Sequence, residues 1–166
     1  MTTTVSGIEL VRLADSIAEV AHEGQLYADG PFIEHPREVS FLAKEFGYPH
    51  EVQATALLHD VLEDTTVTEH ELGYRGIPPV VVSSVVSLTS FPGDRDKIAK
   101  ALSNPISHVV KFFDASVNFA VTEDEPARRG VERGLADMRR YARYLGQLST
   151  DLPKPFEITV YLNNFR

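Results

Sequence analysis

The sequence predicts an all-α fold, a compact helical bundle. Apolar residues from 8 to 21 recur at the three- and four-residue spacing of an amphipathic helix, and those from 131 to 145 do the same. Ser6 followed by Glu9 has the pattern of a capping box, which marks a helix start. Strand and helix patterns do not alternate as they would in a nucleotide-binding sheet. A chain of 166 residues can bury roughly 70% of its unfolded surface, so one helical domain needs no disulfide or structural metal.

Most of the expected helices have a start or a stop signal. They cover residues 8–22, 36–46, 50–62, 68–76, 77–90, 94–102, 105–117 and 126–145. Pro36, Pro105 and Pro126 suit the first position of a helix, whereas Gly24 and Gly30 mark a loop between the first two helices. The valines of 77–90 favour a strand by propensity, but the opening prolines and the lack of a partner strand favour a helix.

The chain is expected to hold one domain over residues 1–150 and a C-terminal tail over 151–166. Residues 157–162 of this tail alternate weakly between polar and apolar. The pattern leaves strand, helix and interaction arm open.

Composition excludes several classes of protein. The formal net charge of −8 argues against binding nucleic acid through its phosphates. The chain has no cysteine, which excludes disulfides and cysteine-ligated zinc and fits a cytoplasmic protein. We find no secretory signal at the N-terminus, and the most apolar run, 77–88, is too short to span a membrane. The expected partner is a small molecule, and the oligomeric state stays open.

The most informative stretch is 56–65, an apolar run that carries His59, Asp60, Glu63 and Asp64. Burying such groups is costly unless something compensates their charge. A divalent metal is a natural compensator because His and Asp are standard ligands. Each residue alone has a plainer interpretation, since a lone buried histidine is more often a satisfied core residue than a ligand.

Four residues are candidate metal ligands: His35, His59, Asp60 and Asp114. Ligands from separate helices would close an inward-facing site, and a donor set of nitrogen and oxygen without sulfur suits Mn²⁺ or another first-row divalent metal. Such a metal would acidify a water and neutralise a phosphate oxygen. We expect Glu63 and Asp64 to handle the protons, with the division of roles between them left open.

Lys111 and Asn118 lie three residues before and four residues after Asp114, so all three share one helix face. A lysine and an amide beside a metal ligand suit phosphate binding. In the plainer interpretation Lys111 extends from the edge of the core, Asn118 is an ordinary surface residue, and Asp114 is a buried carboxylate paired with an arginine or a helix N-terminus.

Four segments in this order carry a family resemblance: residues 21–25 (AHEGQ), 33–36 (IEHP), 59–65 (HDVLEDT) and 110–114 (VKFFD), the last followed by Asn118. The chain resembles the HD phosphohydrolase superfamily, and within it the hydrolase domain of RelA/SpoT proteins and the stand-alone small alarmone hydrolases. The resemblance covers about residues 8–148.

This resemblance implies an all-helical bundle of the HD-domain type over residues 1–150. It also implies one manganese ion, held by His35, His59, Asp60 and Asp114, and a hydrolytic step served by Glu63 and Asp64. The implied reaction removes the 3′-pyrophosphate from guanosine tetra- or pentaphosphate.

The sequence departs from the family pattern in the substrate region. Family members carry a basic pair soon after the glutamine of the first segment, whereas here Leu26, Tyr27 and Ala28 follow Gln25. We expect Gln25, Tyr27, Lys111 and Asn118 to contact the substrate, with Tyr27 offering a flat apolar surface to a base. The alternatives are hydrolysis of another nucleotide or phosphorylated metabolite, and a non-catalytic nucleotide-binding module.

Overall fold

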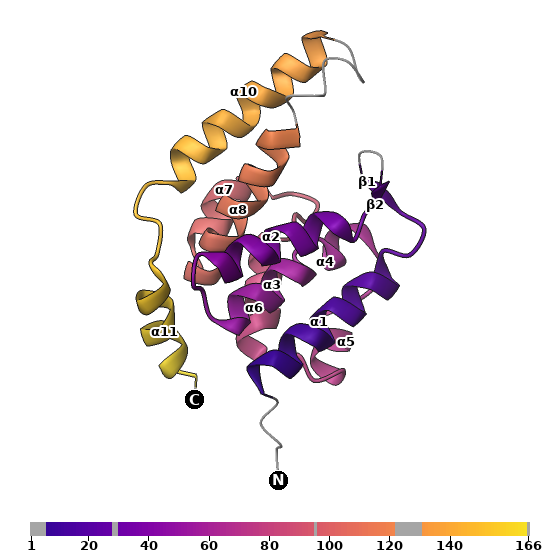
Figure 1. Ribbon diagram of the computed structural model, residues 1–166, viewed down its shortest axis with the longest axis vertical. Helices are drawn as coiled ribbons and strands as arrows, with labels where there is room; N and C mark the ends of the chain where they lie inside the picture. Colours follow the sequence, from indigo (N-terminus) through magenta and orange to yellow (C-terminus); the bar gives the residue numbers. More distant parts are fainter. Residues whose placement is uncertain (1–5, 28–29, 95, 122–130, 166) are drawn as a thin grey trace.

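The computed structural model describes residues 6–27, 30–94, 96–121 and 131–165, and within these it is mainly helical, with one short pair of strands (Figure 1). The all-α prediction is therefore confirmed. The helices are α1 (Gly7–Ala21), α2 (Glu34–Glu45), α3 (His50–Leu58), α4 (Val61–Asp64), α5 (Glu69–Tyr74), α6 (Pro79–Leu88), α7 (Lys97–Leu102), α8 (Pro105–Val121), α10 (Val131–Leu148) and α11 (Pro155–Asn163).

The helix start signals act as the sequence indicates. The Ser6 hydroxyl accepts from the Glu9 amide at 3.3 Å, and the Ser6 amide donates to the Glu9 carboxylate at 2.9 Å. This closed capping box satisfies two backbone groups that the first turn of α1 leaves free. The valine-rich segment after Ile77 is helix α6, with Pro79 in its first turn, so helix burial outweighs the strand propensity of valine.

The prediction of one helix over 50–62 is wrong. Helix α3 ends at Leu58 and the short helix α4 begins at Val61. His59 and Asp60, which join them, keep near-helical angles (φ −60°, ψ −31° and φ −99°, ψ −7°). Because this turn is built from angles so close to those of a helix, apolar periodicity carries no trace of it.

Other features also differ from the expectation. Helix α2 begins two residues before Pro36, and α7 begins at Lys97 rather than at 94 because the Asp96 carboxylate caps it, accepting from the amides of Ile98 and Ala99 at 3.0 Å. The expected loop at 24–31 contains an antiparallel hairpin of strands β1 (Leu26–Tyr27) and β2 (Gly30–Pro31). The expected helix start at Pro126 lies outside the described residues.

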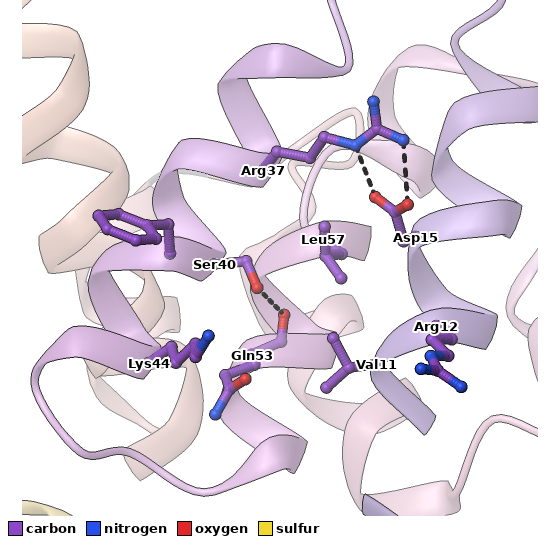
Figure 2. Close-up of a pocket in the computed structure, with 9 residues that line it drawn as sticks. Val11, Arg12, Asp15, Arg37, Ser40, Lys44, Gln53 and Leu57 are labelled. Carbon is purple, nitrogen blue, oxygen red and sulfur yellow. Dashed lines mark hydrogen bonds and ion pairs between the residues drawn. The ribbon is translucent and has the colours of Figure 1, made fainter. Parts of the chain in front are cut away.

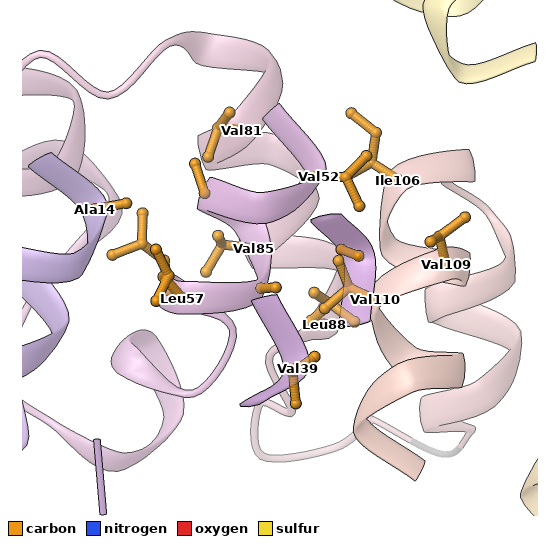
Figure 3. Packing of buried hydrophobic residues seen from close by; sticks show 14 of the residues in the cluster. Ala14, Val39, Val52, Leu57, Val81, Val85, Leu88, Ile106, Val109 and Val110 are labelled. Carbon is orange, nitrogen blue, oxygen red and sulfur yellow. The ribbon is translucent and has the colours of Figure 1, made fainter. Parts of the chain in front are cut away.

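Helix α3 runs through the middle of the core (Figure 3). All its residues from Val52 to Leu58 are buried, as expected for a helix packed on every side. Valines of α6 approach it from one direction and apolar residues of α8, such as Ile106 and Val110, from another. The site described below lies where this central helix ends.

Helices α1 and α2 are braced by Arg37, whose guanidinium donates to both Asp15 oxygens, at 2.7 and 2.9 Å (Figure 2). The brace forms one wall of a pocket of about 280 Å³ between α1, α2 and α3. Arg12 and Lys44 stand on either side of this pocket. Asp15 and Glu19 of α1 compensate the charge of Arg37 on α2. These ion pairs hold the two helices together, so we assign Arg37 a structural role.

The C-terminal tail, whose structure the sequence leaves open, forms helix α11 from Pro155. Its Ile158 and Leu162 are buried in the main core, and the Tyr48 hydroxyl donates to the Pro153 carbonyl at 2.8 Å just before it. The expected division into 1–150 and 151–166 stays a prediction. None of the helices in the described residues combines the length and the apolar character needed to cross a membrane.

Ile106→Ala tests the packing of α8 on the core. Ile106 is fully buried, so the truncation should lower the free energy of unfolding by about 2–5 kcal/mol. Urea denaturation measures this as a shift of the midpoint at constant slope. Ile8→Ala is the matched control, because Ile8 is 59% exposed and its loss should cost less than about 0.5 kcal/mol. Equal effects of the two substitutions would contradict the packing described here.

Candidate metal centre

Four polar side chains from three separate segments meet at the end of the central helix. His35 comes from the first turn of α2, His59 and Asp60 form the turn between α3 and α4, and Asp114 comes from the middle of α8. The two histidines and Asp114 are buried, whereas Asp60 is partly exposed. The turn that ends α3 is therefore also what delivers two adjacent side chains to one point.

The facing atoms are close together. His35 Nε2 lies 3.2 Å from Asp114 Oδ1 and 3.9 Å from Asp60 Oδ2. His59 Nε2 lies 3.1 Å from Asp60 Oδ2 and 3.7 Å from Asp114 Oδ1. His35, His59 and Asp114 each offer a ligand atom within 4.8 Å of the others, so these three buried residues form a group that could hold a metal ion. Asp60 borders this group through its contacts with both imidazoles.

Hydrogen bonding of His59 orients this group for a cation. Its Nδ1 is 2.7 Å from the Ala56 carbonyl, which can only accept, so Nδ1 carries the hydrogen. Its Nε2 then faces the carboxylates, buried and without a hydrogen-bond partner among the described residues. A fixed tautomer, with one ring nitrogen on a backbone carbonyl and the other directed into a cluster of oxygens, is the usual arrangement of a metal-bound histidine. The residues present therefore fit a divalent metal.

The charges of the site depend on one another. Burial alone would lower the pKa of His59, but the carboxylates of Asp60 and Asp114 outweigh it and raise that pKa well above its ordinary value. Burial would likewise raise the pKa of Asp114, yet the Lys111 ammonium and the two histidines hold it well below its usual range. Positive charge must face these carboxylates, and either protons or a metal ion can supply it.

Three of the four predicted substrate-binding residues support Asp114. The Lys111 ammonium donates to Asp114 Oδ2 at 2.7 Å, and the Asn118 amide donates to Oδ1 at 2.5 Å and to the Asp114 carbonyl at 3.0 Å. Tyr27 in turn donates to the Asn118 side-chain oxygen at 2.7 Å, and its ring lies 4.6 Å from that of His35. Burial raises the pKa of Tyr27, so it stays a hydrogen-bond donor.

The two predicted catalytic carboxylates, Glu63 and Asp64, lie together on α4, the helix that starts directly after Asp60. Glu63 accepts from the Ser90 amide at 2.9 Å and from the Lys97 ammonium at 3.2 Å. Burial, with the nearby charges of Asp60 and Glu63, raises the pKa of Asp64. Their catalytic roles stay predictions, as do the substrate contacts of the four residues named for them.

The sequence pattern did not single out three residues that the structure places around these groups. Ser90 and Lys97 hold Glu63 from the far end of α6 and from α7. His22, at the end of α1, is buried and 2.8 Å from the side-chain oxygen of Gln25, whose amide nitrogen donates to the Asp64 carbonyl at 2.9 Å. Only His22 had a signal, since it stands inside the first segment of the family resemblance.

No family model matches the chain, but curated proteins match parts of it. A guanosine-3′,5′-bis(diphosphate) 3′-pyrophosphohydrolase of Haemophilus influenzae is 47% identical over 57 residues, 34% of this chain and 8% of that protein. The bifunctional (p)ppGpp synthase/hydrolase SpoT of Escherichia coli is 36% identical over 92 residues, 55% of this chain and 12% of that protein. The chain thus matches only about a tenth of the length of these relatives.

A solved structure extends the likeness to the whole fold. A metazoan ortholog of SpoT, described as hydrolysing ppGpp and acting in starvation responses, has a TM-score of 0.70 and 17% identity, covering 99% of this chain and 98% of its own. The chain thus shares the fold of this SpoT ortholog and is similar over part of its length to guanosine-3′,5′-bis(diphosphate) 3′-pyrophosphohydrolases. The fold class expected from the sequence, an all-α bundle of the HD-domain type, is thereby confirmed.

Manganese should stabilise the folded chain. An ion bound only by the folded chain adds about 2.7 kcal/mol to the free energy of unfolding at 100 times its dissociation constant. We expect the melting temperature to rise on addition of Mn²⁺, and His59→Ala to abolish the rise because it removes an inward-facing nitrogen. His70→Ala, an exposed histidine, is the control and should keep it. An equal rise in all three proteins would place the bound ion elsewhere.

Lys111→Met should destabilise the metal-free chain by about 3 kcal/mol at neutral pH, because it leaves the Asp114 carboxylate buried beside fewer cations. The pKa of Asp114 is lower in the folded chain than in the unfolded chain, where it is near 3.9. This difference stabilises the folded chain at pH values above 3.9, and the stabilisation is lost as the pH falls towards the pKa of the folded chain. The gap between wild type and variant should therefore narrow below about pH 4.

Denaturation at a series of pH values measures this gap. Lys97→Met is the control, since the Lys97–Glu63 pair is exposed and should contribute less than about 1 kcal/mol. A gap for Lys111→Met that stays constant down to pH 2 would show that the lysine acts through packing and not through Asp114.

Proposed function

We propose that this chain is a manganese-dependent phosphohydrolase that removes the 3′-pyrophosphate from guanosine tetra- or pentaphosphate. The observation that carries the proposal is the meeting of His35, His59, Asp60 and Asp114 at one point, with two carboxylates on the next helix turn. The names of the partial relatives and the likeness in fold support the same reaction. The cytoplasmic location stays a prediction.

These four residues would hold the ion. Two imidazoles and two carboxylates, without sulfur, suit Mn²⁺ among the first-row metals. When bound, the ion supplies a Lewis acid that lowers the pKa of a water and neutralises a phosphate oxygen. The Lys111 ammonium lowers the pKa of Asp114 and so keeps this carboxylate ionised for binding the ion.

The two carboxylates of α4 would divide the proton transfers. Glu63, which accepts from the Ser90 amide and the Lys97 ammonium, would take a proton from the attacking water. Asp64, whose pKa is raised by burial and by its acidic neighbours, keeps a proton to higher pH than an ordinary aspartate. It would give that proton to the ribose 3′-oxygen as the bond from this oxygen to phosphorus breaks and pyrophosphate leaves.

Substrate binding would use groups next to the ion site. The Lys111 ammonium has three hydrogens, of which one faces Asp114, so the others remain for a phosphate. Gln25, Tyr27 and Asn118 complete the proposed contacts, with the Tyr27 ring as a surface for the base.

One observation favours a different substrate. Where the family has a basic pair after the glutamine, the hairpin here presents Leu26, which is 78% exposed, and Tyr27. Such a surface offers less attraction to a second phosphate cluster, so another nucleotide or phosphorylated metabolite is the second candidate.

The test is incubation of the manganese-loaded protein with guanosine tetraphosphate, guanosine pentaphosphate, GTP and GDP. The proposal predicts that guanosine tetraphosphate gives GDP and pyrophosphate in equal amounts, while GTP and GDP stay intact. Turnover of GTP without turnover of guanosine tetraphosphate would favour the second candidate. Tight binding of guanosine tetraphosphate with no product at any manganese concentration would point to a non-catalytic module.

Asp64→Asn should reduce the turnover number by about 10²–10⁴-fold, since asparagine cannot donate the carboxyl proton. Asp151→Asn, an exposed aspartate in the turn after α10, is the matched control and should match wild type. Unchanged turnover in Asp64→Asn would remove Asp64 from the mechanism and leave Glu63 as the remaining candidate.

A further inference from the structure

His22 is a buried histidine for which the proposed mechanism has no use. It follows the last residue of α1 and is 2% exposed. Its Nε2 is buried and has no hydrogen-bond partner among the described residues. Leaving a buried polar atom unsatisfied costs about 1–3 kcal/mol, so the rest of the ring must contribute something that an apolar residue would not.

The other ring nitrogen begins a chain of hydrogen bonds that ends on the proposed catalytic helix. His22 Nδ1 lies 2.8 Å from the Gln25 side-chain oxygen, and the Gln25 amide nitrogen donates to the Asp64 carbonyl at 2.9 Å. An amide donates only through its nitrogen, so the Gln25 oxygen must accept and His22 Nδ1 must carry the hydrogen. The ring tautomer and the Gln25 orientation therefore determine each other.

Further contacts hold both His22 and Gln25 in place. The His22 ring stacks on Phe32 with centroids 4.5 Å apart, and the Phe32 amide donates to the Gln25 carbonyl at 3.0 Å. The Gln25 amide in turn donates to the His22 carbonyl at 3.0 Å. The Gln25 side chain thus leaves a rigid corner and points in one direction.

The receiving end of the chain needs such a partner. Helix α4 has only four residues and ends at Asp64, so its last carbonyl oxygens have no N–H donors within the helix. The side-chain amide of Gln25 donates to the backbone carbonyl of Asp64, the residue proposed to donate the proton. Without this hydrogen bond, fewer contacts would join the end of α4 to residues 21–25, and the last turn of α4 could fray.

We propose that His22 is a positioning residue for Asp64. By donating through Nδ1 it sets the orientation of Gln25, and Gln25 then fixes the end of α4 and with it the direction of the Asp64 side chain. The inference rests on the proposed function for the role of Asp64, and on the hydrogen bonds alone for the mechanical link.

Three substitutions of His22 distinguish the roles of its two ring nitrogens. Asparagine can place an amide N–H near the position of Nδ1, glutamine can place one near Nε2, and alanine has neither. We expect His22→Ala and His22→Gln to lower kcat for guanosine tetraphosphate by about 10–100-fold, the cost of a misplaced catalytic group. KM and the affinity for Mn²⁺ should change less than about twofold, because neither uses Asp64. His22→Asn should restore most of kcat.

Other outcomes of this comparison overturn the proposal. Rescue by glutamine and not by asparagine would mean that His22 acts through Nε2. A loss of Mn²⁺ affinity equal to the loss of kcat would mean that it shapes the metal site. A further loss of kcat when His22→Ala is added to Asp64→Asn would mean that His22 does not act through Asp64, since a positioning residue has no effect once its target is gone.

Amide hydrogen exchange tests the mechanical link without any activity. His22→Ala should speed exchange in residues 61–66 and leave α6 and α8 unchanged, while His70→Ala should change neither. Faster exchange throughout the chain would reflect general loss of stability and overturn the local role. If the wild type hydrolyses no guanosine tetraphosphate but exchange changes as expected, the proposed function fails and the link stands. If the wild type is active and the His22→Ala variant matches it in both assays, only this inference fails.

Discussion

The site depends on the burial of one carboxylate, Asp114, inside a helix that otherwise packs apolar residues into the core. An ionised aspartate in such a place is stable only if cations and donors surround it. Lys111 and Asn118 come from the same helix face and use both Asp114 oxygens, and the two imidazoles close the other side. The carboxylate therefore organises a shell of partners drawn from α2, α8 and the end of α3.

The core and the site are coupled through the central helix. Helix α3 is buried on every side, so its position is set by the packing of α1, α2, α6 and α8 around it. His59 and Asp60 follow directly after its last residue, so the position of α3 also fixes theirs. Because the turn they form also starts α4, the same backbone orients this pair of candidate metal ligands and the carboxylates of Glu63 and Asp64. A cluster that needs sub-ångström placement is thus attached to the most constrained element of the fold.

The segment after Gln25 departs from the RelA/SpoT pattern, whereas the candidate metal ligands follow it. Both acidic residues of α4 are also present, while Leu26, Tyr27 and Ala28 stand where that pattern has a basic pair. Tyr27 from that segment donates to Asn118, which supports Asp114. A residue proposed to contact the substrate is thus bonded to a residue that supports a candidate metal ligand, which would couple the two proposed roles.

The sequence by itself determined the helical class, most helix starts and the identity of the four residues that meet. Those features are written in local patterns: Ser6 with Glu9 caps α1 through atoms three residues apart, and a histidine and acids within an apolar run indicate buried charge wherever the run lies. Periodicity could not reveal the turn at His59–Asp60, whose backbone angles are nearly helical, nor the capping of α7 by Asp96, nor the fate of the tail, whose apolar residues acquire a partner only when the core exists. What only the tertiary structure decided is which distant atoms face each other. The His22–Gln25–Asp64 chain and the bonds of Lys97 and Ser90 to Glu63 join residues up to 39 positions apart, and no local energy term links such residues before the helices pack.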